Sequence, residues 1–251
     1  MKNFLGQNGF VWWFGVVEDI NDPVQLGRVR VRCIGWHTDD KDKIPTESLP
    51  WAIPMFDNQS ASKKGVGDSP TGLLVGSWVL GFFIDGSRAQ EPAILGSISG
   101  SYIEGENRFP DINALARGEQ TKSYTPDSVI SEPADPYAAD YPYNKVRETE
   151  SGHVKEYDDT PDKERIRELH KSGTFYQVHP DGSVSTHIVK DNYTVVAGND
   201  SVHVTGNVKL VVDANVDADI TGYLRMNIGE TCDITSGKNM TLIAPEIHLN
   251  P

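Results

Sequence analysis

The sequence is poor in cysteine and in basic residues, and it contains no long apolar run. Cys33 and Cys232 fit neither a CxxC motif nor a zinc-ligand spacing, so we expect two isolated buried thiols. The formal net charge of −13 argues against a nucleic-acid partner, because phosphate contacts need Lys and Arg, and against docking on an anionic membrane. No stretch reaches 18 apolar residues, and the first ten residues hold no apolar signal region. We therefore expect no membrane-spanning helix and a protein made in a cytoplasm.

Turns and short alternating strands dominate instead. The 251 residues include 23 Gly and 15 Pro, which favours many turns and little long helix. Five strand candidates bounded by turn residues are 10–20, 27–36, 51–56, 77–85 and 91–98. Five strands with no helical periodicity between them predict a small OB-type barrel over residues 9–104, after an arm of residues 1–8.

Arginines at positions 28, 30 and 32 alternate with valines, which predicts a half-exposed strand with three guanidinium groups on one face. Such a face leaves open an OB-fold nucleic-acid-binding protein with a trimerisation stalk as an alternative function, which the overall acidity opposes. The Gly- and Ser-rich loop at 57–74 does not open a helix. We interpret it as a flexible or partner-contacting loop, not as a phosphate cradle.

Residues 105–150 contain five prolines, many acidic residues and little apolar periodicity. We expect an extended linker without a core of its own, in which Glu132 and Asp135 are solvated charges. Four tyrosines could anchor this linker on a neighbouring surface: Tyr124, Tyr137, Tyr141 and Tyr143.

Residues 151–195 are predicted to form a neck of antiparallel strands. Turn residues stand at 158–161, 171–173 and 180–182. The acidic group Glu156, Asp158 and Asp159 precedes Thr160-Pro161, so we interpret it as part of a turn and not as a calcium or catalytic cluster.

The last region, 196–251, is an eight-residue repeat. Its valine column is Val196, Val204, Val212, Ile220 and Ile228, and its glycine column is Gly198, Gly206, Ala214 and Gly222. Gly tolerates left-handed backbone, so we expect each octad to end in a corner. Because eight is even, one face stays apolar throughout: 18 of the 25 even positions from 196 to 244 are Ala, Val, Ile, Leu, Met or Cys.

An eight-residue rung is too short for one chain to close a β-helix on itself, which usually takes roughly 20 or more residues. Three chains that each supply one wall would enclose a dry prism, so we predict an intertwined trimer. The predicted trimer core is Val196, Val204, Val208, Leu210, Val212, Val216, Ile220, Leu224, Met226, Ile228, Ile234 and Leu242.

The octads, preceded by "ESGHVKEYDDTPDKERI" and "HKSGTFYQVHPDGSV", resemble the central spikes of contractile-tailed phages such as T4. They are also similar to the valine-glycine-repeat spikes of type VI secretion. "GVVEDINDPVQLGRVRVRCIGWHTDD", "PTESLPWAIPM" and "SPTGLLVGSWVLGFFIDG" resemble the OB domain of the same phage spikes. The resemblance implies an all-β homotrimer, with OB domains on a baseplate hub protein, a needle-like triple-stranded β-helix, and localisation in the virion tail baseplate.

The implied function is a structural spike that pierces the host envelope when the sheath contracts; a spike of a type VI-like or other contractile injection system is the alternative. T4-like spikes carry a lysozyme domain between barrel and needle. The 46 residues in that interval are too few for one, so we expect no enzyme, no catalytic residue and no cofactor.

Seven histidines invite a metal hypothesis, yet His179, His187 and His203 have no ligand at a suitable spacing, so we expect surface histidines. His248 stands at an even position, where three copies could meet on the trimer axis. Some related tips bind iron through a His-x-His pair, but position 250 is Asn. We favour tip packing without metal, and we expect a small tip protein similar to PAAR-repeat cones to dock on Ile247, His248, Leu249, Asn250 and Pro251.

Overall fold

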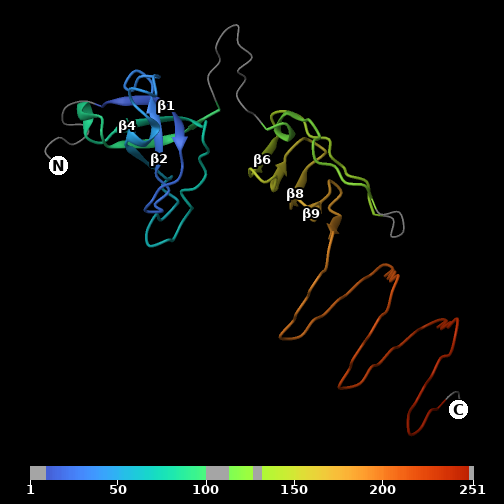
Figure 1. The fold of residues 1–251 in the computed structure, drawn as a ribbon. Coiled ribbons are helices and arrows are strands. Elements are labelled where there is room, and N and C mark those ends of the chain that lie inside the picture. The colour runs from blue at the N-terminus through green and yellow to red at the C-terminus, as the bar shows by residue number, and fades with distance from the viewer. Residues whose placement is uncertain (1–9, 100–112, 127–131, 249–251) are drawn as a thin grey trace. The chain divides into compact units, whose positions relative to one another are not determined.

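The computed structural model describes residues 10–99, 113–126 and 132–248. In these residues the chain is all-β, with ten strands and three single-turn 3-10 helices. The strands form a closed barrel and an open five-stranded sheet (Figure 1), and residues 196–251 separate from the rest as a second unit. None of the described helices has the length and apolar character needed to cross a membrane.

The barrel contains five strands in the region where five were predicted. They are β1 (Trp12–Asp19), β2 (Val29–Cys33), β3 (Trp51–Pro54), β4 (Trp78–Phe83) and β5 (Pro92–Ile98). The order around the barrel is β1-β2-β3-β5-β4, with β1 and β4 completing the circle. Only the pairing of β3 with β5 is parallel among these neighbours. The predicted small barrel is confirmed, and closure leaves it without an open sheet edge.

Trp13 lies at the centre of the barrel core with 1% of its surface exposed. The indole packs against Phe83 at 5.9 Å between ring centroids. A Cβ at Gly81 would lie 2.3 Å from Cζ2 of Trp13 and 2.2 Å from the carbonyl oxygen of Ala93, so only glycine leaves room for the indole there. Cys33 belongs to the same core, and burial raises the pKa of its thiol to about 12. The prediction of a buried thiol is confirmed for this cysteine.

The second sheet is an antiparallel meander in which each strand pairs with the next. Its strands are β6 (Asn144–Glu148), β7 (Val154–Asp158), β8 (Arg165–Leu169), β9 (Phe175–Val178) and β10 (Val184–His187). Gly173 and Gly182 occupy the β8–β9 and β9–β10 turns with φ of 99° and 82°, a region that favours glycine. Burial alternates strictly along β7 and β8, so one face is enclosed and the other is open.

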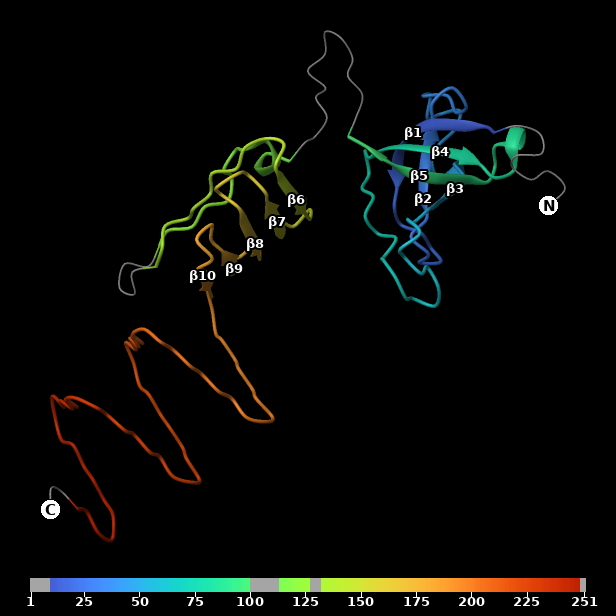
Figure 2. The ribbon, with the colours of Figure 1, turned by 180° about the vertical axis from the view of Figure 1, so that it is seen from behind.

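The enclosed face is covered by residues 113–126 and 132–143, which we call the covering segment. Figure 2 shows this segment, in green, running past strands β6 to β10. Leu115 is fully buried in a core with Val154 and Phe175, and Tyr124 and Tyr137 pack against that core. The expectation of a linker without a core is therefore wrong for these residues. Anchoring by tyrosines is confirmed for Tyr124 and Tyr137, whereas Tyr141 and Tyr143 are exposed.

The C-terminal ribbon, residues 196–248, runs as long extended stretches joined by bends (Figure 1, orange to red). The bends stand at 197–198, 205–206, 213–214, 221–222, 229–230, 237–238 and 245. Their spacing of eight residues is the predicted octad. Every residue of the described ribbon is exposed, and none of them belongs to a strand of the single chain.

Candidate functional site

The ribbon presents the most extensive uncovered apolar surface of the described chain. All twelve residues predicted for the trimer core are exposed, with Val208 at 77% and Leu210 at 78%. The backbone N–H and C=O groups of the ribbon also have no strand partner within the described chain. Apolar side chains and unpaired extended backbone are both costly in water, so this surface is the candidate site for an interaction. Cys232 lies on this surface and is exposed, so the prediction of a buried thiol is wrong for the single chain.

A second apolar surface lies on the outside of the barrel. Trp12, Phe14, Ile34 and Trp36 are between 38% and 55% exposed. With Trp13, Trp78 and Ile98 they line a hollow of about 460 Å³, which we call the aromatic patch. Sequence reasoning missed it, although a signal exists. The stretch from Phe10 to Phe14 is apolar at consecutive positions, so a strand here presents apolar side chains to both faces.

Arg30 and Arg32 on β2, and Arg28 directly before β2, all have partners within the barrel. Arg28 forms an ion pair with Asp22 at 2.7 Å, and Arg32 forms one with Glu18 at 2.7 Å. Arg30 lies over the Trp51 ring at 4.5 Å. Arg32 is only 6% exposed, so the prediction of a half-exposed arginine row is wrong at this position. Its partners come from residues 18, 38 and 44, outside its own strand, which is why alternation alone did not indicate burial.

These pairs shift the acidity of the two carboxyl groups. The hydrogen bond from Arg32 lowers the pKa of Glu18 to about 2, with further hydrogen bonds from Thr46 and Lys41. The hydrogen bond from Arg28 holds the pKa of Asp22 far below its usual range. Both carboxylates therefore stay charged and paired at neutral pH. The guanidinium groups of these pairs could bind phosphate only if the ion pairs were broken. This disfavours the alternative function of nucleic-acid binding.

A charged network lies beside the apolar core on the enclosed face of the β6–β10 sheet. Glu156 on β7 faces Arg165 on β8 at 3.0 Å, and both are almost fully buried. Asp158 accepts hydrogen bonds from the backbone N–H and the hydroxyl of Thr160 at 3.0 and 2.6 Å. The prediction that this acidic group belongs to a turn is confirmed for Asp158. Glu156 is not a turn residue but a buried partner of an arginine, and Asp159 is exposed and paired with Lys145.

Two acidic residues of the covering segment join this network. Asp135 lies 3.5 Å from Arg167, and Glu132 lies 3.2 Å from Nδ1 of His187. Their side chains are 6% and 7% exposed, so the prediction of solvated linker charges is wrong. Burial lowers the pKa of Arg167, whose guanidinium donates to the Lys122 carbonyl at 2.7 Å. The ion pair of Asp135 with Arg167 thus connects the covering segment to the sheet.

The histidines differ in their burial and in their partners. His179 is buried, with Nε2 2.9 Å from the Ser185 hydroxyl, so the surface prediction is wrong for it. His187 is partly buried, whereas His203 is exposed. His248 is exposed beside Glu246, and positions 249–251 of the predicted tip site lie outside the described residues. Across the described residues, no group of three or more His, Cys, Asp or Glu side chains is arranged to hold a metal ion.

The comparisons with known proteins agree on one family. A family model described as the Gp5 N-terminal OB domain matches residues 35–168, from the turn after β2 into β8. Protein Gp5 of Vibrio phage KVP40 is 35% identical over 90% of this chain and 68% of its own length. The pre-baseplate central spike protein Gp5 of Enterobacteria phage T4 is 40% identical over 107 residues, which are 41% of this chain and 18% of the T4 protein. The chain belongs to the Gp5 family of phage central spike proteins.

Proposed function

We propose that this chain is the structural central spike of a contractile phage tail, located in the baseplate of the virion, and that it pierces the host envelope when the sheath contracts. Membership of the Gp5 family supports the spike role. The observation that carries the mechanical part is the ribbon, whose octads keep one apolar face over more than fifty residues with no cover in the described chain. A passive needle needs a continuous dry interior, which this face can supply.

The cover of the ribbon is two further copies of the same chain. Each extended stretch between bends holds six residues, for example 199–204, or about 20 Å of strand. Three such stretches arranged around one axis bring the even-numbered apolar side chains together and let each strand pair with the neighbouring chains. Paired strands have no open edges, and unfolding must separate all three chains together, so such a needle resists mechanical and thermal disruption.

The spike itself performs no catalysis in this proposal. The closely placed carboxyl groups of the described neck, Glu156 and Asp158, are buried and held by Arg165 and Thr160. A glycoside hydrolase needs two carboxyl groups that flank a substrate in an open cleft. Groups that are enclosed and paired are structural parts of the sheet.

Two partner proteins belong to the same proposal. The aromatic patch of the barrel fits a baseplate hub protein, because Trp-rich patches are typical of protein interfaces. The region around Ile247 and His248, both exposed, fits a small PAAR-like tip protein.

The mass of the purified full-length protein tests the central element of the proposal. Light scattering should give three times the chain mass over a wide range of protein concentration. A monodisperse monomer would contradict the trimer, and with it the needle.

A further inference from the structure

Five buried side-chain atoms of the β6–β10 sheet have no hydrogen-bond partner among the described residues. Two are acceptors, Oδ1 of Asn144 and Oδ2 of Asp158, and three are donors, Nε of Arg165, Nε of Arg167 and Nε2 of Gln177. None of these five residues exposes more than 5% of its surface. Native proteins leave only a few buried polar atoms per hundred residues without a partner, so five in one sheet require an explanation.

The five residues form one continuous cluster on the enclosed face. Asn144 on β6 is the register partner of Asp158 on β7, which is in turn the register partner of Arg165 on β8. Arg167, two positions further along β8, pairs with Gln177 on β9. Nη1 of Arg165 lies 3.4 Å from Oε1 of Gln177, which connects the two halves of the cluster.

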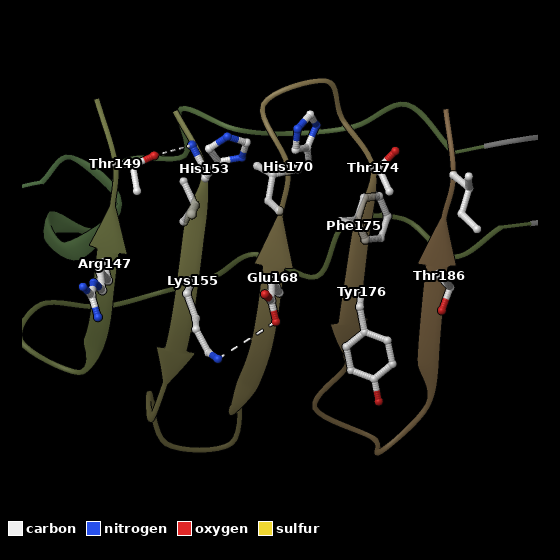
Figure 3. Close-up of a pocket in the computed structure, with 13 residues that line it drawn as sticks. Arg147, Thr149, His153, Lys155, Glu168, His170, Thr174, Phe175, Tyr176 and Thr186 are labelled. Atoms are coloured by element: carbon white, nitrogen blue, oxygen red, sulfur yellow. Dashed lines mark hydrogen bonds and ion pairs between the residues drawn. The ribbon is translucent and has the colours of Figure 1, made fainter. Parts of the chain in front are cut away.

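The open face of the same strands shows where the cluster points. Glu168 and Tyr176 stand next to Arg167 and Gln177 in the sequence, and Figure 3 shows both side chains on the open face. Successive side chains of a strand point to opposite faces, so Arg167 and Gln177 point toward the covering segment. The hydrogen bond from Arg167 to the carbonyl oxygen of Lys122, at 2.7 Å, agrees with this direction.

One charged contact in the cluster is too long for a hydrogen bond. Oδ2 of Asp158 lies 4.0 Å from Nη2 of Arg165, although neither side chain exposes any surface. The other oxygen of Asp158, Oδ1, accepts hydrogen bonds from Thr160. A polar contact longer than about 3.5 Å is a position where a water molecule can bridge the two groups.

We infer that ordered water molecules are bound between the sheet and the covering segment and complete the hydrogen bonds of this cluster. Water fits because it both donates and accepts, and the cluster offers unpaired atoms of both kinds. An internal water makes about three hydrogen bonds, so five atoms need at least two molecules. The register pairs assign one to Asn144, Asp158 and Arg165, and one to Arg167 and Gln177. The inference concerns a single chain and does not depend on the proposed trimer.

The charges of the cluster disfavour an ion in the same place. The guanidinium groups of Arg165 and Arg167 oppose a cation, and the carboxylates of Glu156, Asp158 and Asp135 oppose an anion. In addition, no three His, Cys, Asp or Glu side chains of the described chain are arranged to hold a metal ion. A neutral ligand that donates and accepts avoids both conflicts.

The bound water extends the contact between the sheet and the covering segment. Asn144 and Arg167 each donate to a backbone carbonyl oxygen of that segment, Leu115 at 3.1 Å and Lys122 at 2.7 Å. Their remaining unpaired atoms are the ones assigned to water. The segment and the water therefore share the same side chains, and water can leave the cluster only when the segment or the sheet opens.

A crystal structure of the full-length protein, at a resolution that shows ordered water, tests the inference. We expect density peaks about 2.5–3.2 Å from Oδ2 of Asp158 and from Nε2 of Gln177 in every copy of the chain. Gln177→Leu removes the amide, so it should lose the second peak and keep the first. Tyr176→Phe is the matched control: it removes a polar group from the open face of the same strand and should keep both peaks.

Three results would overturn the inference or part of it. A structure with ordered water elsewhere, but with no peak within about 3.5 Å of the five atoms, would overturn it entirely. An anomalous signal in the cluster after a bromide soak would identify an anion in place of water. Both peaks unchanged in Gln177→Leu would overturn the assignment of Gln177. If Gln177→Leu does not fold, the peaks in the unmodified protein and the bromide soak decide.

Discussion

Nη2 of Arg165 lies 3.0 Å from Oε1 of Glu156, and neither side chain exposes more than 1% of its surface. The pair is enclosed from two sides. Asn144 donates its side-chain amide to the same Oε1 at 3.0 Å, and the Tyr137 ring of the covering segment lies 5.0 Å from the guanidinium carbon. A buried ion pair of this kind adds little stability compared with apolar side chains of similar volume. The loss of one partner is nevertheless costly, because it leaves the other charge buried without that partner.

Glu156→Gln should therefore lower the free energy of unfolding of the neck by about 3 kcal/mol, the lower end of the range for a broken buried ion pair, because Arg165 would keep its charge in an enclosed site with only the more distant carboxylate of Asp158, at 4.0 Å. Urea unfolding monitored by tyrosine fluorescence checks this. Glu119→Gln is the matched control: Glu119 also pairs with an arginine, Arg117, but both side chains are largely exposed. A small effect of Glu156→Gln, equal to that of the control, would mean that water reaches the pair.

The barrel should lose stability in acid through Glu18. Its pKa is lowered to about 2 in the folded state, from the ordinary value of 4.5 for a glutamate side chain. A lowered folded-state pKa gives stability that is present above the unfolded pKa and is lost as the pH falls, here between about 4.5 and about 2. Glu18→Gln should be less stable than the unmodified barrel at pH 7, and the difference should shrink toward pH 2. Thermal unfolding from pH 6 to 2 measures it; a constant difference would contradict the assignment. Asp22 contributes a similar loss, so the variant still weakens in acid.

Thiol reactivity should report assembly. Cys33 is buried in the barrel with a pKa raised to about 12, so it should not react with a thiol reagent at pH 8. Cys232 is exposed in the single chain and stands at an even, apolar-face position of the ribbon. The assembled trimer should thus show no fast-reacting thiol, and the denatured chain should show two. One fast thiol in a sample of trimeric mass would place Cys232 outside the core.

Val212→Asp should prevent assembly or make it strongly dependent on pH. The change brings three carboxylates near one axis without partners, at a cost of several kcal/mol. Asn215→Asp adds the same group at an odd, outward position of the same ribbon and should leave the trimer intact. Sedimentation at several protein concentrations checks both variants. Assembly of Val212→Asp equal to that of the control would show that position 212 does not face the axis.

The purified spike should not clear a suspension of peptidoglycan, because the neighbouring carboxyl groups of the neck, Glu156 and Asp158, are enclosed in an ion pair and hydrogen bonds. Lysozyme added to the same suspension is the positive control. Clearing by the spike that disappeared on the replacement of a single carboxylate would identify it as an enzyme.

The sequence alone predicted those parts of the fold whose pattern can be recognised within a few neighbouring residues. The barrel strands and the octad bends follow from alternation and from turn residues, which are visible within a few positions. The covering segment was missed because its contacts are distant: Leu115 meets Val154 and Phe175, and Asp135 meets Arg167. An extended, proline-rich segment shows no period in its sequence, so neither its burial nor that of Arg32 beside Glu18 was predictable from local patterns.

Because the bends of the ribbon recur at a fixed interval, its length is set by the number of octads. Successive bends are eight residues apart, and side chains alternate between faces. Deletion of a whole octad removes one extended stretch with its bend and keeps every later side chain on its original face. Deletion of a single residue turns every later side chain to the opposite face, so valines would point outward and aspartates inward. If the proposed trimer is correct, the ribbon can therefore grow or shrink in evolution only by whole octads, and a shorter or longer ribbon can be built by excising or duplicating a segment such as residues 207–214.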